Sequence, residues 1–188
     1  MTFIQKPEVK ICCISSVQEA EIAVNSGASA IGLVSAMPSG PGIISDEMII
    51  EIVRTISPVI KTFLLTSEIQ ADKIISQIRK FRTNTIQIVD EIEPDEYWKI
   101  RKELPEVQIV QVVHVTDTAS VEYAVKVSEF ADAILLDSGN PLLQTKILGG
   151  TGKTHNWRIS KMIIDAVRIP VYLAGGLNAE NVKEAIET

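Results

Sequence analysis

Short apolar segments alternate with amphipathic segments along the whole chain. The apolar segments are rich in β-branched residues and almost free of polar positions, which is typical of parallel strands buried on both faces. Their positions predict strands at residues 9–15, 30–35, 59–65, 85–89, 108–115, 133–137 and 170–174. The amphipathic segments predict helices at residues 17–25, 45–56, 69–81, 94–104, 118–129, 156–167 and from Asn178 onward.

This alternation indicates seven strand–helix units with parallel strands, because no pair of strands is joined by a tight hairpin turn. Such units build either an open doubly wound sheet or an eight-unit barrel. We predict a TIM (β/α)8-type barrel, formed as a single domain by residues 1–188, in which seven units are present and an eighth is missing. The first and last strands would then have unpaired edges, which we expect a second chain or an additional segment to cover.

Composition narrows the classes of function. Hydrophobic residues make up 46% of the chain, which favours a large folded core over disorder. The net charge is -6 and no run of Lys or Arg occurs, which argues against nucleic-acid binding. The N-terminal segment is too polar for a signal peptide, and no apolar run approaches the roughly 18 residues of a membrane span. We therefore predict a cytoplasmic protein without a membrane partner.

Polar side chains at the ends of the predicted strands are the candidate site, since ligands of α/β barrels bind there. Asp137 follows a buried strand, where desolvation would suit a general acid, although it could also be a solvated loop residue. Cys12 could be a general base if Lys10 lowers its pKa, or a small buried hydrophobe. Gln87 and His114 end two further strands and could contact a ligand.

The two cysteines are adjacent, at positions 12 and 13. Neighbouring residues of a strand point to opposite faces, so we expect no disulfide bond between them. No arrangement of Cys, His and Asp has the spacing of a metal site, and we predict no metal and no cofactor.

Two glycine-rich segments are candidates for phosphate binding. The loop around Gly150 and Gly152 is not a nucleotide P-loop, because Ile147 stands where that motif needs its first glycine. We expect it to bind an anion through backbone amides. Gly175 and Gly176 precede a predicted helix, where amides could bind phosphate, but they could equally form a tight strand–helix turn.

In combination, these segments resemble the phosphoribosylanthranilate isomerase family of tryptophan biosynthesis. The resemblance extends over almost the whole chain and rests on residues 9–12, 27–32, 135–137, 149–154 and 173–178, together with Trp157, Asn181 and Val182. It implies a (β/α)8 barrel that performs an Amadori rearrangement of a phosphorylated ribosylamine without cofactor or metal. It also implies a phosphorylated small-molecule substrate. A homodimer is one arrangement that would cover the unpaired strand edges.

The resemblance implies roles for individual residues. Asp137 would be the general acid that opens the ribose ring, and Cys12 the general base that removes the proton from C2′. The substrate and its phosphate would lie beside Gln87, Gly150, Gly152, Gly175 and Gly176.

Several positions depart from the family pattern, and Cys13 and Gly42 are two of them. Cys13 stands where the family has glycine, and Gly42 stands where it has an arginine that holds the anthranilate carboxylate. Glycine does not replace a bidentate guanidinium contact. Two alternatives therefore stay open. One is a weak or inactive homologue that binds a different phosphorylated metabolite or a protein partner. The other is an aldolase-type barrel enzyme with Lys10 as its Schiff-base lysine.

Overall fold

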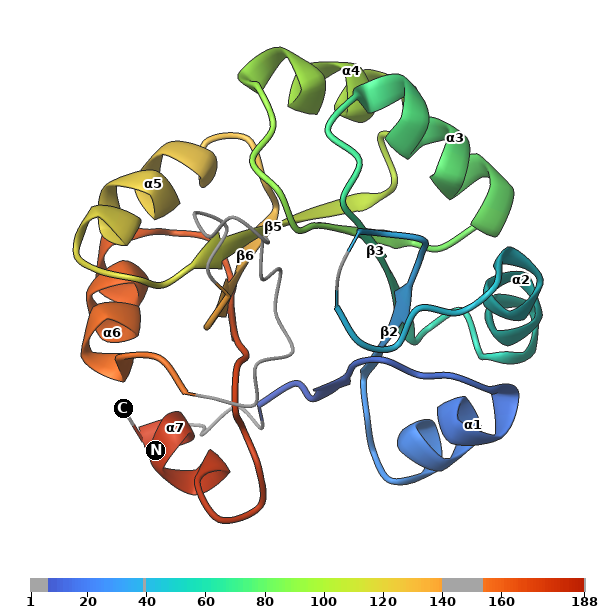
Figure 1. Ribbon diagram of the computed structural model, residues 1–188, viewed down its shortest axis with the longest axis horizontal. Helices are drawn as coiled ribbons and strands as arrows, with labels where there is room; N and C mark the ends of the chain where they lie inside the picture. Colours follow the sequence, from blue (N-terminus) through green and yellow to red (C-terminus); the bar gives the residue numbers. More distant parts are fainter. Residues whose placement is uncertain (1–6, 39, 140–153, 188) are drawn as a thin grey trace.

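The described part of the protein is one curled parallel sheet with helices packed around its outside (Figure 1). The computed structural model describes residues 7–38, 40–139 and 154–187. Within these ranges the strands follow one another in chain order, β1-β2-β3-β4-β5-β6-β7, and each neighbouring pair is parallel. This is the sheet of a TIM-type barrel, as the alternating pattern predicts.

The seven predicted units are all present. The strands are β1 (Lys10–Ile11), β2 (Ala30–Val34), β3 (Lys61–Thr66), β4 (Thr85–Ile88), β5 (Gln108–His114), β6 (Ala133–Asp137) and β7 (Val171–Leu173). The helices are α1 (Val17–Asn25), α2 (Asp46–Thr55), α3 (Ala71–Phe81), α4 (Pro94–Glu103), α5 (Ala119–Val127), α6 (Trp157–Ala166) and α7 (Val182–Glu187). The largest difference from the predicted bounds is β1, which has two residues in place of the seven predicted.

Two apolar layers explain why the strands have almost no polar positions. Alternate strand residues fill the barrel interior, which consists of Ala30, Val34, Phe63, Leu65, Val89, Val110, Val112, Ala133 and Leu135. The residues between them point outward and pack against the helices, for example Ile86 against the layer that contains Ile74 and Ile78 of α3. Both faces of each central strand are therefore removed from water, which is the main stabilising contribution of the fold.

Side-chain caps fix where several helices begin. The Ser16 hydroxyl accepts a hydrogen bond from the Glu19 amide at the start of α1, and Ser45 does the same for Met48 at α2. The Asn156 side chain accepts from the Arg158 amide at α6. Each cap satisfies a backbone donor that the first helical turn leaves unpaired. The loops between strand ends and helix starts are thereby held in place.

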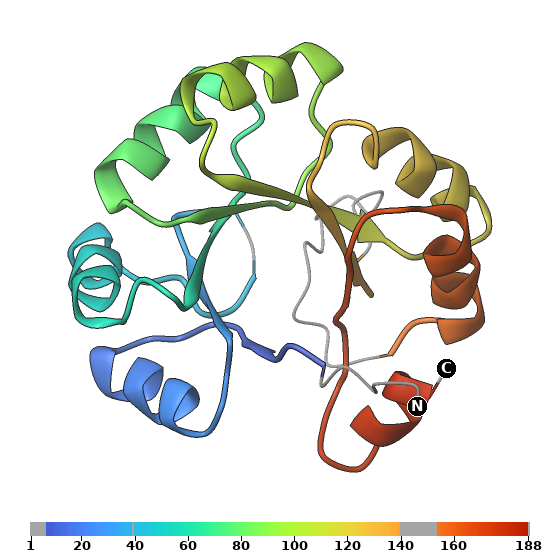
Figure 2. The same ribbon diagram turned by 180° about the vertical axis from the view of Figure 1, so that it is seen from behind.

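The sheet has two free ends. No backbone pairing joins β1 to β7 within the described residues, although the curl of the sheet brings both toward the same side (Figures 1 and 2). Exposed Val9, Ile11 and Ile22 line an apolar hollow of about 520 Å³ between β1 and α1. That a second chain or further segment covers these edges stays a prediction.

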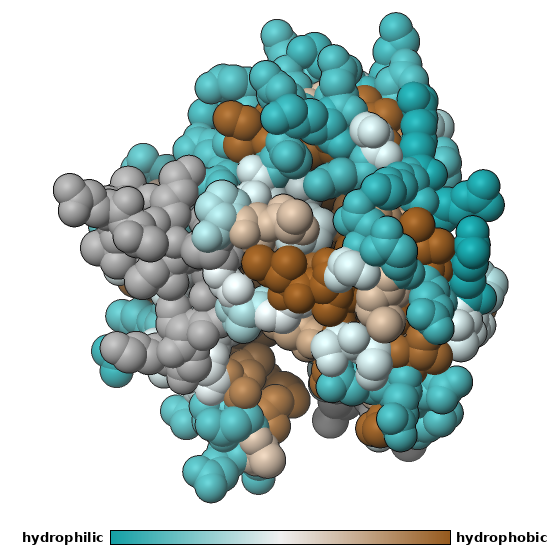
Figure 3. All heavy atoms as spheres, turned by 45° about the vertical axis from the view of Figure 1, so that its right-hand side comes forward, coloured by the Kyte–Doolittle hydropathy of each residue, from teal (hydrophilic) through white to brown (hydrophobic). Residues whose placement is uncertain are grey.

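Hydrophilic side chains dominate the surface over the outer helices, and apolar side chains gather near the centre of the face drawn in Figure 3. No helix among the described residues combines the length and the apolar character needed to cross a membrane.

Candidate active site

Lys10 and Cys12 turn their functional groups toward the barrel interior at the end of β1. Gly32 of β2 has no side chain, and a Cβ atom built on it would lie 2.9 Å from Cys12 Sγ and 3.1 Å from Lys10 Nζ. Lys10 Nζ also lies 5.0 Å from the ring centre of Phe63 in the barrel interior. Gly32 therefore provides the space in which a thiol and an ammonium group come together.

The pKa of the Cys12 thiol is lowered from its ordinary value. The largest cause is a hydrogen bond from the Cys13 side chain, and the positive charge of Lys10 acts in the same direction, while burial of the sulfur opposes both. The residue as a whole is exposed because β1 is an edge strand, but its sulfur is turned away from solvent toward Gly32. A thiol that ionises this readily is suited to remove a proton at neutral pH.

Cys13 does not lie on the strand, contrary to the sequence-based expectation that the two cysteines point to opposite faces. Strand β1 ends at Ile11, and Cys13 has a left-handed backbone with φ 60°. Its thiol donates a hydrogen bond of 3.7 Å to the Pro41 carbonyl, and both cysteines are free of disulfide bonds. The neighbouring Cys12 thiol and burial raise the pKa of Cys13, so Cys13 keeps its proton.

Gly42 lies directly against Cys13. A Cβ atom at Gly42 would be 2.5 Å from Cys13 Cβ and 2.9 Å from Cys13 Sγ, and Gly42 also has a left-handed backbone with φ 80°. A side chain at position 42 therefore requires the Cys13 side chain to move. Gly42 has no side chain, so the guanidinium group expected from the resemblance is absent at this position.

Asp137 is the last residue of β6 and is partly buried. One of its oxygens, Oδ1, accepts a hydrogen bond of 2.7 Å from the Ser138 amide. The turn after β7 packs against it: a Cβ atom at Gly175 would lie 3.0 Å from Asp137 Oδ1 and 2.9 Å from Ser138 Oγ. Gly175 and Gly176 have φ values of 83° and 65°. Both predicted features, the carboxyl group and the glycine turn, therefore lie together at the strand ends.

Two buried acceptors at neighbouring strand ends have no partner within the described part of the chain. Gln87, which is 5% exposed, leaves its Oε1 unpaired. His114 Nε2 lies 3.1 Å from the Val89 carbonyl, which requires the proton on Nε2 and leaves Nδ1 as a free acceptor. Buried polar atoms are rarely unpaired in a folded protein, so both atoms are suited to accept hydrogen bonds from a ligand.

The remaining predictions for the site are not tested by these contacts. Gly150 and Gly152 lie outside the described residues. Among the residues that are described, no group of three or more His, Cys, Asp and Glu side chains could hold a metal ion.

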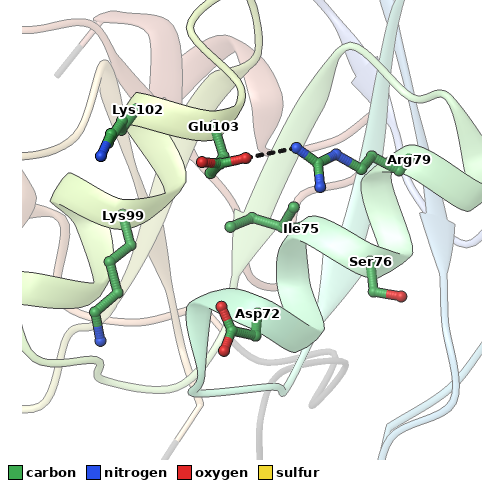
Figure 4. A pocket seen from close by; sticks show the side chains of 7 residues that line it. All are labelled: Asp72, Ile75, Ser76, Arg79, Lys99, Lys102 and Glu103. Carbon is green, nitrogen blue, oxygen red and sulfur yellow. Dashed lines mark hydrogen bonds and ion pairs between the residues drawn. The ribbon is translucent and has the colours of Figure 1, made fainter.

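A separate hollow of about 500 Å³ lies on the outside of the barrel between α3 and α4 (Figure 4). Asp72, Ile75, Ser76 and Arg79 line it from α3, and the ion pair between Arg79 and Glu103 crosses it at 2.7 Å. It lies on helix surfaces, away from the strand ends. It is therefore separate from the candidate site at the strand ends.

A parallel barrel-type sheet with a thiol, a carboxyl group and a glycine turn at its strand ends defines a (β/α)-barrel protein. Comparison with known proteins identifies the family. Residues 9–188 match the family model described as N-(5′-phosphoribosyl)anthranilate isomerase. The chain therefore belongs to the phosphoribosylanthranilate isomerase family.

Individual relatives agree with this assignment. A phosphoribosylanthranilate isomerase from Methanocella arvoryzae is 33% identical over 179 residues, which cover 95% of this chain and 82% of the relative. The crystal structure of the isomerase from Thermotoga maritima has a TM-score of 0.81 at 31% identity and covers 97% of this chain and 83% of its own. Another isomerase structure, with a TM-score of 0.78 at 28% identity, covers 97% and 82% and contains reduced 1-(o-carboxyphenylamino)-1-deoxyribulose 5-phosphate.

Proposed function

We propose that this protein catalyses the Amadori rearrangement of N-(5-phosphoribosyl)anthranilate to 1-(o-carboxyphenylamino)-1-deoxyribulose 5-phosphate in tryptophan biosynthesis. Membership of the isomerase family supports the reaction class. The observation that carries the proposal is the Cys12 thiol with a lowered pKa at one strand end, with the Asp137 carboxyl group at another. The reaction needs one acid and one base, and these two residues supply them.

In the first step Asp137 donates a proton to the ribose ring oxygen. The bond between C1′ and that oxygen breaks, and the nitrogen lone pair forms a protonated Schiff base with C1′. The hydrogen bond from the Ser138 amide and the contact with Gly175 hold the carboxyl group in one orientation. Asp137 must carry its proton when the substrate binds, and it leaves this step as a carboxylate.

In the second step the Cys12 thiolate removes the proton from C2′. The positively charged Schiff base withdraws electrons from the adjacent C–H bond, and the released electron pair forms the C1′–C2′ double bond of a neutral enolamine. The enolamine then takes up a proton at C1′ while its C2′ hydroxyl loses one, which gives the neutral C2′ ketone. Lys10 and Cys13 favour the thiolate from which this step starts.

Substrate binding is assigned to the surrounding polar groups. The backbone amides of Gly175 and Gly176 would bind the phosphate, because residues without Cβ allow an anion to approach the backbone closely. Gly150 and Gly152 would contribute from the preceding loop. The unpaired Oε1 of Gln87 would accept a hydrogen bond from a substrate hydroxyl.

The proposal is tested by mixing the purified protein with freshly prepared N-(5-phosphoribosyl)anthranilate and identifying the product by NMR. A product of unchanged mass with a C2′ ketone is expected, and Asp137→Asn should form it at least about 10²-fold more slowly, since the amide cannot donate the proton as an acid. A substrate that remains a ribosylamine in the presence of folded protein would contradict the proposal.

A second candidate is favoured by the contact between Cys13 and Gly42, which leaves position 42 without a cationic side chain. The protein would then bind a different phosphorylated metabolite, with little or no catalysis of the anthranilate substrate. Competition by phosphorylated amino sugars that lack a carboxylate, measured against the anthranilate compound by calorimetry, separates the two candidates. Tighter binding of the carboxylate-free compounds would favour the second.

A further inference from the structure

His114 ends β5 on the interior face of the barrel, next to the proposed general acid. Val110 and Val112 of β5 fill the interior, and side chains alternate along a strand, so His114 faces the same way. Leu135 of β6 places Asp137 on the interior face by the same alternation. The ladder between β5 and β6 pairs His114 directly with Asp137. Because neighbouring strands lie about 4.8 Å apart, the imidazole and the carboxyl group stand side by side.

Contacts at the end of β4 hold the His114 ring in one orientation. Its Nε2 lies 3.1 Å from the carbonyl oxygen of Val89, which can only accept, so Nε2 carries the hydrogen and Nδ1 of the neutral ring is an acceptor. The Gln111 side chain donates hydrogen bonds to the carbonyls on either side, those of Ile88 at 3.2 Å and Asp90 at 3.0 Å. The Val89 carbonyl is therefore held in place, and so is the ring that bonds to it.

The other ring nitrogen, Nδ1, is buried and has no hydrogen-bond partner within the described part of the chain. A buried acceptor without a partner costs free energy and is rare in folded proteins. The adjacent carboxyl group of Asp137 already accepts a hydrogen bond from the Ser138 amide at Oδ1. The protein thus presents an acceptor beside the proposed acid that a donor on a ligand can pair.

The proposed reaction creates such a donor. In the cyclic substrate the ring oxygen joins C1′ and C4′ and carries no hydrogen. When Asp137 transfers its proton to this oxygen and the bond to C1′ breaks, the oxygen becomes the C4′ hydroxyl of an open chain. Proton transfer requires this oxygen to lie within hydrogen-bonding distance of Asp137, and therefore close to the imidazole on the neighbouring strand.

We propose that His114 stabilises the open-chain form of the substrate: its Nδ1 accepts a hydrogen bond from the C4′ hydroxyl that ring opening creates. This inference rests on the proposed function. The closed ring cannot make this bond, because its oxygen has no hydrogen to donate. An interaction that forms only after ring opening speeds the later steps without tightening the binding of the substrate. It also opposes the return of the proton to Asp137 and the closure of the ring.

Two substitutions separate this role from a structural one. Glutamine at position 114 can place its amide near the Nε2 position and keep the bond to Val89, but it has no acceptor in place of Nδ1. Asparagine can place its side-chain oxygen near the Nδ1 position, but it is too short to keep the bond to Val89. A structural role predicts more damage in His114→Asn, and the proposed role predicts a lower kcat in His114→Gln.

The first measurement is steady-state kinetics with N-(5-phosphoribosyl)anthranilate. His114→Gln should lower kcat by about 3- to 10-fold, the range for loss of one neutral hydrogen bond, and should leave KM within about 2-fold. His114→Asn should show the smaller loss of kcat, and circular dichroism melts check that both variants fold. A kcat of His114→Gln equal to that of the natural protein, or a lower kcat in His114→Asn than in His114→Gln, would overturn the proposal.

The second measurement needs no turnover. Calorimetry compares the product with its ketone reduced, an open-chain compound that carries the C4′ hydroxyl, with its 4′-deoxy counterpart. Removing the hydroxyl should weaken binding about 3- to 10-fold more in the natural protein than in His114→Gln, because only the natural protein has the acceptor. Equal losses in the two proteins, or no binding of the open-chain compound to the natural protein, would also overturn the proposal.

The two measurements distinguish failure of this inference from failure of the proposed function. Binding that depends on both the C4′ hydroxyl and His114, in a protein that does not rearrange the substrate, would support the contact and remove the proposed function. Normal rearrangement together with equal losses on removal of the hydroxyl would leave the proposed function intact and remove the role of His114.

Discussion

Replacing Gly175 by alanine should impair the reaction far more than it impairs the fold. The added Cβ would lie 3.0 Å from Asp137 Oδ1, 2.9 Å from Ser138 Oγ and 3.0 Å from the Ser138 amide nitrogen. All three atoms belong to the segment that carries the proposed general acid. Because backbone and carboxyl group are both contacted, the clash can be relieved only by moving Asp137 or the turn.

A matched control, Gly27→Ala, separates the effect of the contact with Asp137 from the cost of a left-handed backbone. Gly175 has a φ of 83° and Gly27 a φ of 97°, but a Cβ at Gly27 would meet nothing within 4 Å. Both substitutions should carry the backbone cost of about 1–2 kcal/mol for a left-handed alanine, and only Gly175→Ala adds the contact with Asp137. A displacement of about 1 Å at a reacting group can cost about 10²-fold in rate.

The assay is steady-state decay of substrate fluorescence for the natural protein, Gly175→Ala and Gly27→Ala, with urea unfolding of each. We expect Gly27→Ala to lose only the stability that the left-handed backbone costs and Gly175→Ala to lose more, and we expect only Gly175→Ala to lose kcat, by about 10²-fold. Equal kcat values for the two variants would refute the reasoning that the glycine turn positions Asp137.

Three further predictions follow from the same contacts. In the pH profile of kcat/KM, activity should fall on the acidic side as Cys12 becomes protonated. Because the Cys12 pKa is lowered, the midpoint of this fall should lie below the pKa of about 8.5 of a free thiol. A midpoint at or above about 8.5 would contradict the assignment. In Gly32→Ala the added Cβ would lie 2.9 Å from Cys12 Sγ, so the variant should displace the thiol and lower kcat. A fully active variant would show that the space left by Gly32 is not needed to place Cys12. Burial lowers the pKa of His155 below 6.5, so the unfolded protein binds a proton here that the folded protein does not, and stability should fall as pH drops through about 6.5. In thermal melts, His155→Gln should reduce the dependence of the melting temperature on pH in this range. An unchanged dependence in the variant would contradict this prediction.

Much of the fold is predictable from the sequence because parallel strands that are buried on both faces have almost continuous apolar sequences. The end of β1 is the exception. Residues 9–15 have strong β propensity, but the strand stops at Ile11 because Cys13 adopts a left-handed conformation that propensity does not encode. The expectation that the two thiols point to opposite faces was wrong for this reason.

The candidate site was predictable where chemistry coincides with a strand end. Position made Cys12 and Asp137 candidates, and the resemblance supplied their proposed roles. The lowering of the Cys12 pKa by Lys10 agrees with the position of Lys10 two residues earlier. The larger contribution from Cys13 to the Cys12 pKa was missed, because strand propensity does not reveal the left-handed backbone of Cys13. The space beside Gly32 could have been predicted, because a glycine inside a buried strand often indicates that another group approaches the backbone closely there.

The central claim is that Cys12 is the base of an isomerase, and one measurement tests it most directly. Fluorescence of freshly prepared N-(5-phosphoribosyl)anthranilate is followed after addition of the purified protein or its Cys12→Ala variant, both shown to melt cooperatively. The account predicts decay with the natural protein that is at least about 10²-fold faster than with Cys12→Ala. Equal rates for the two proteins would contradict it.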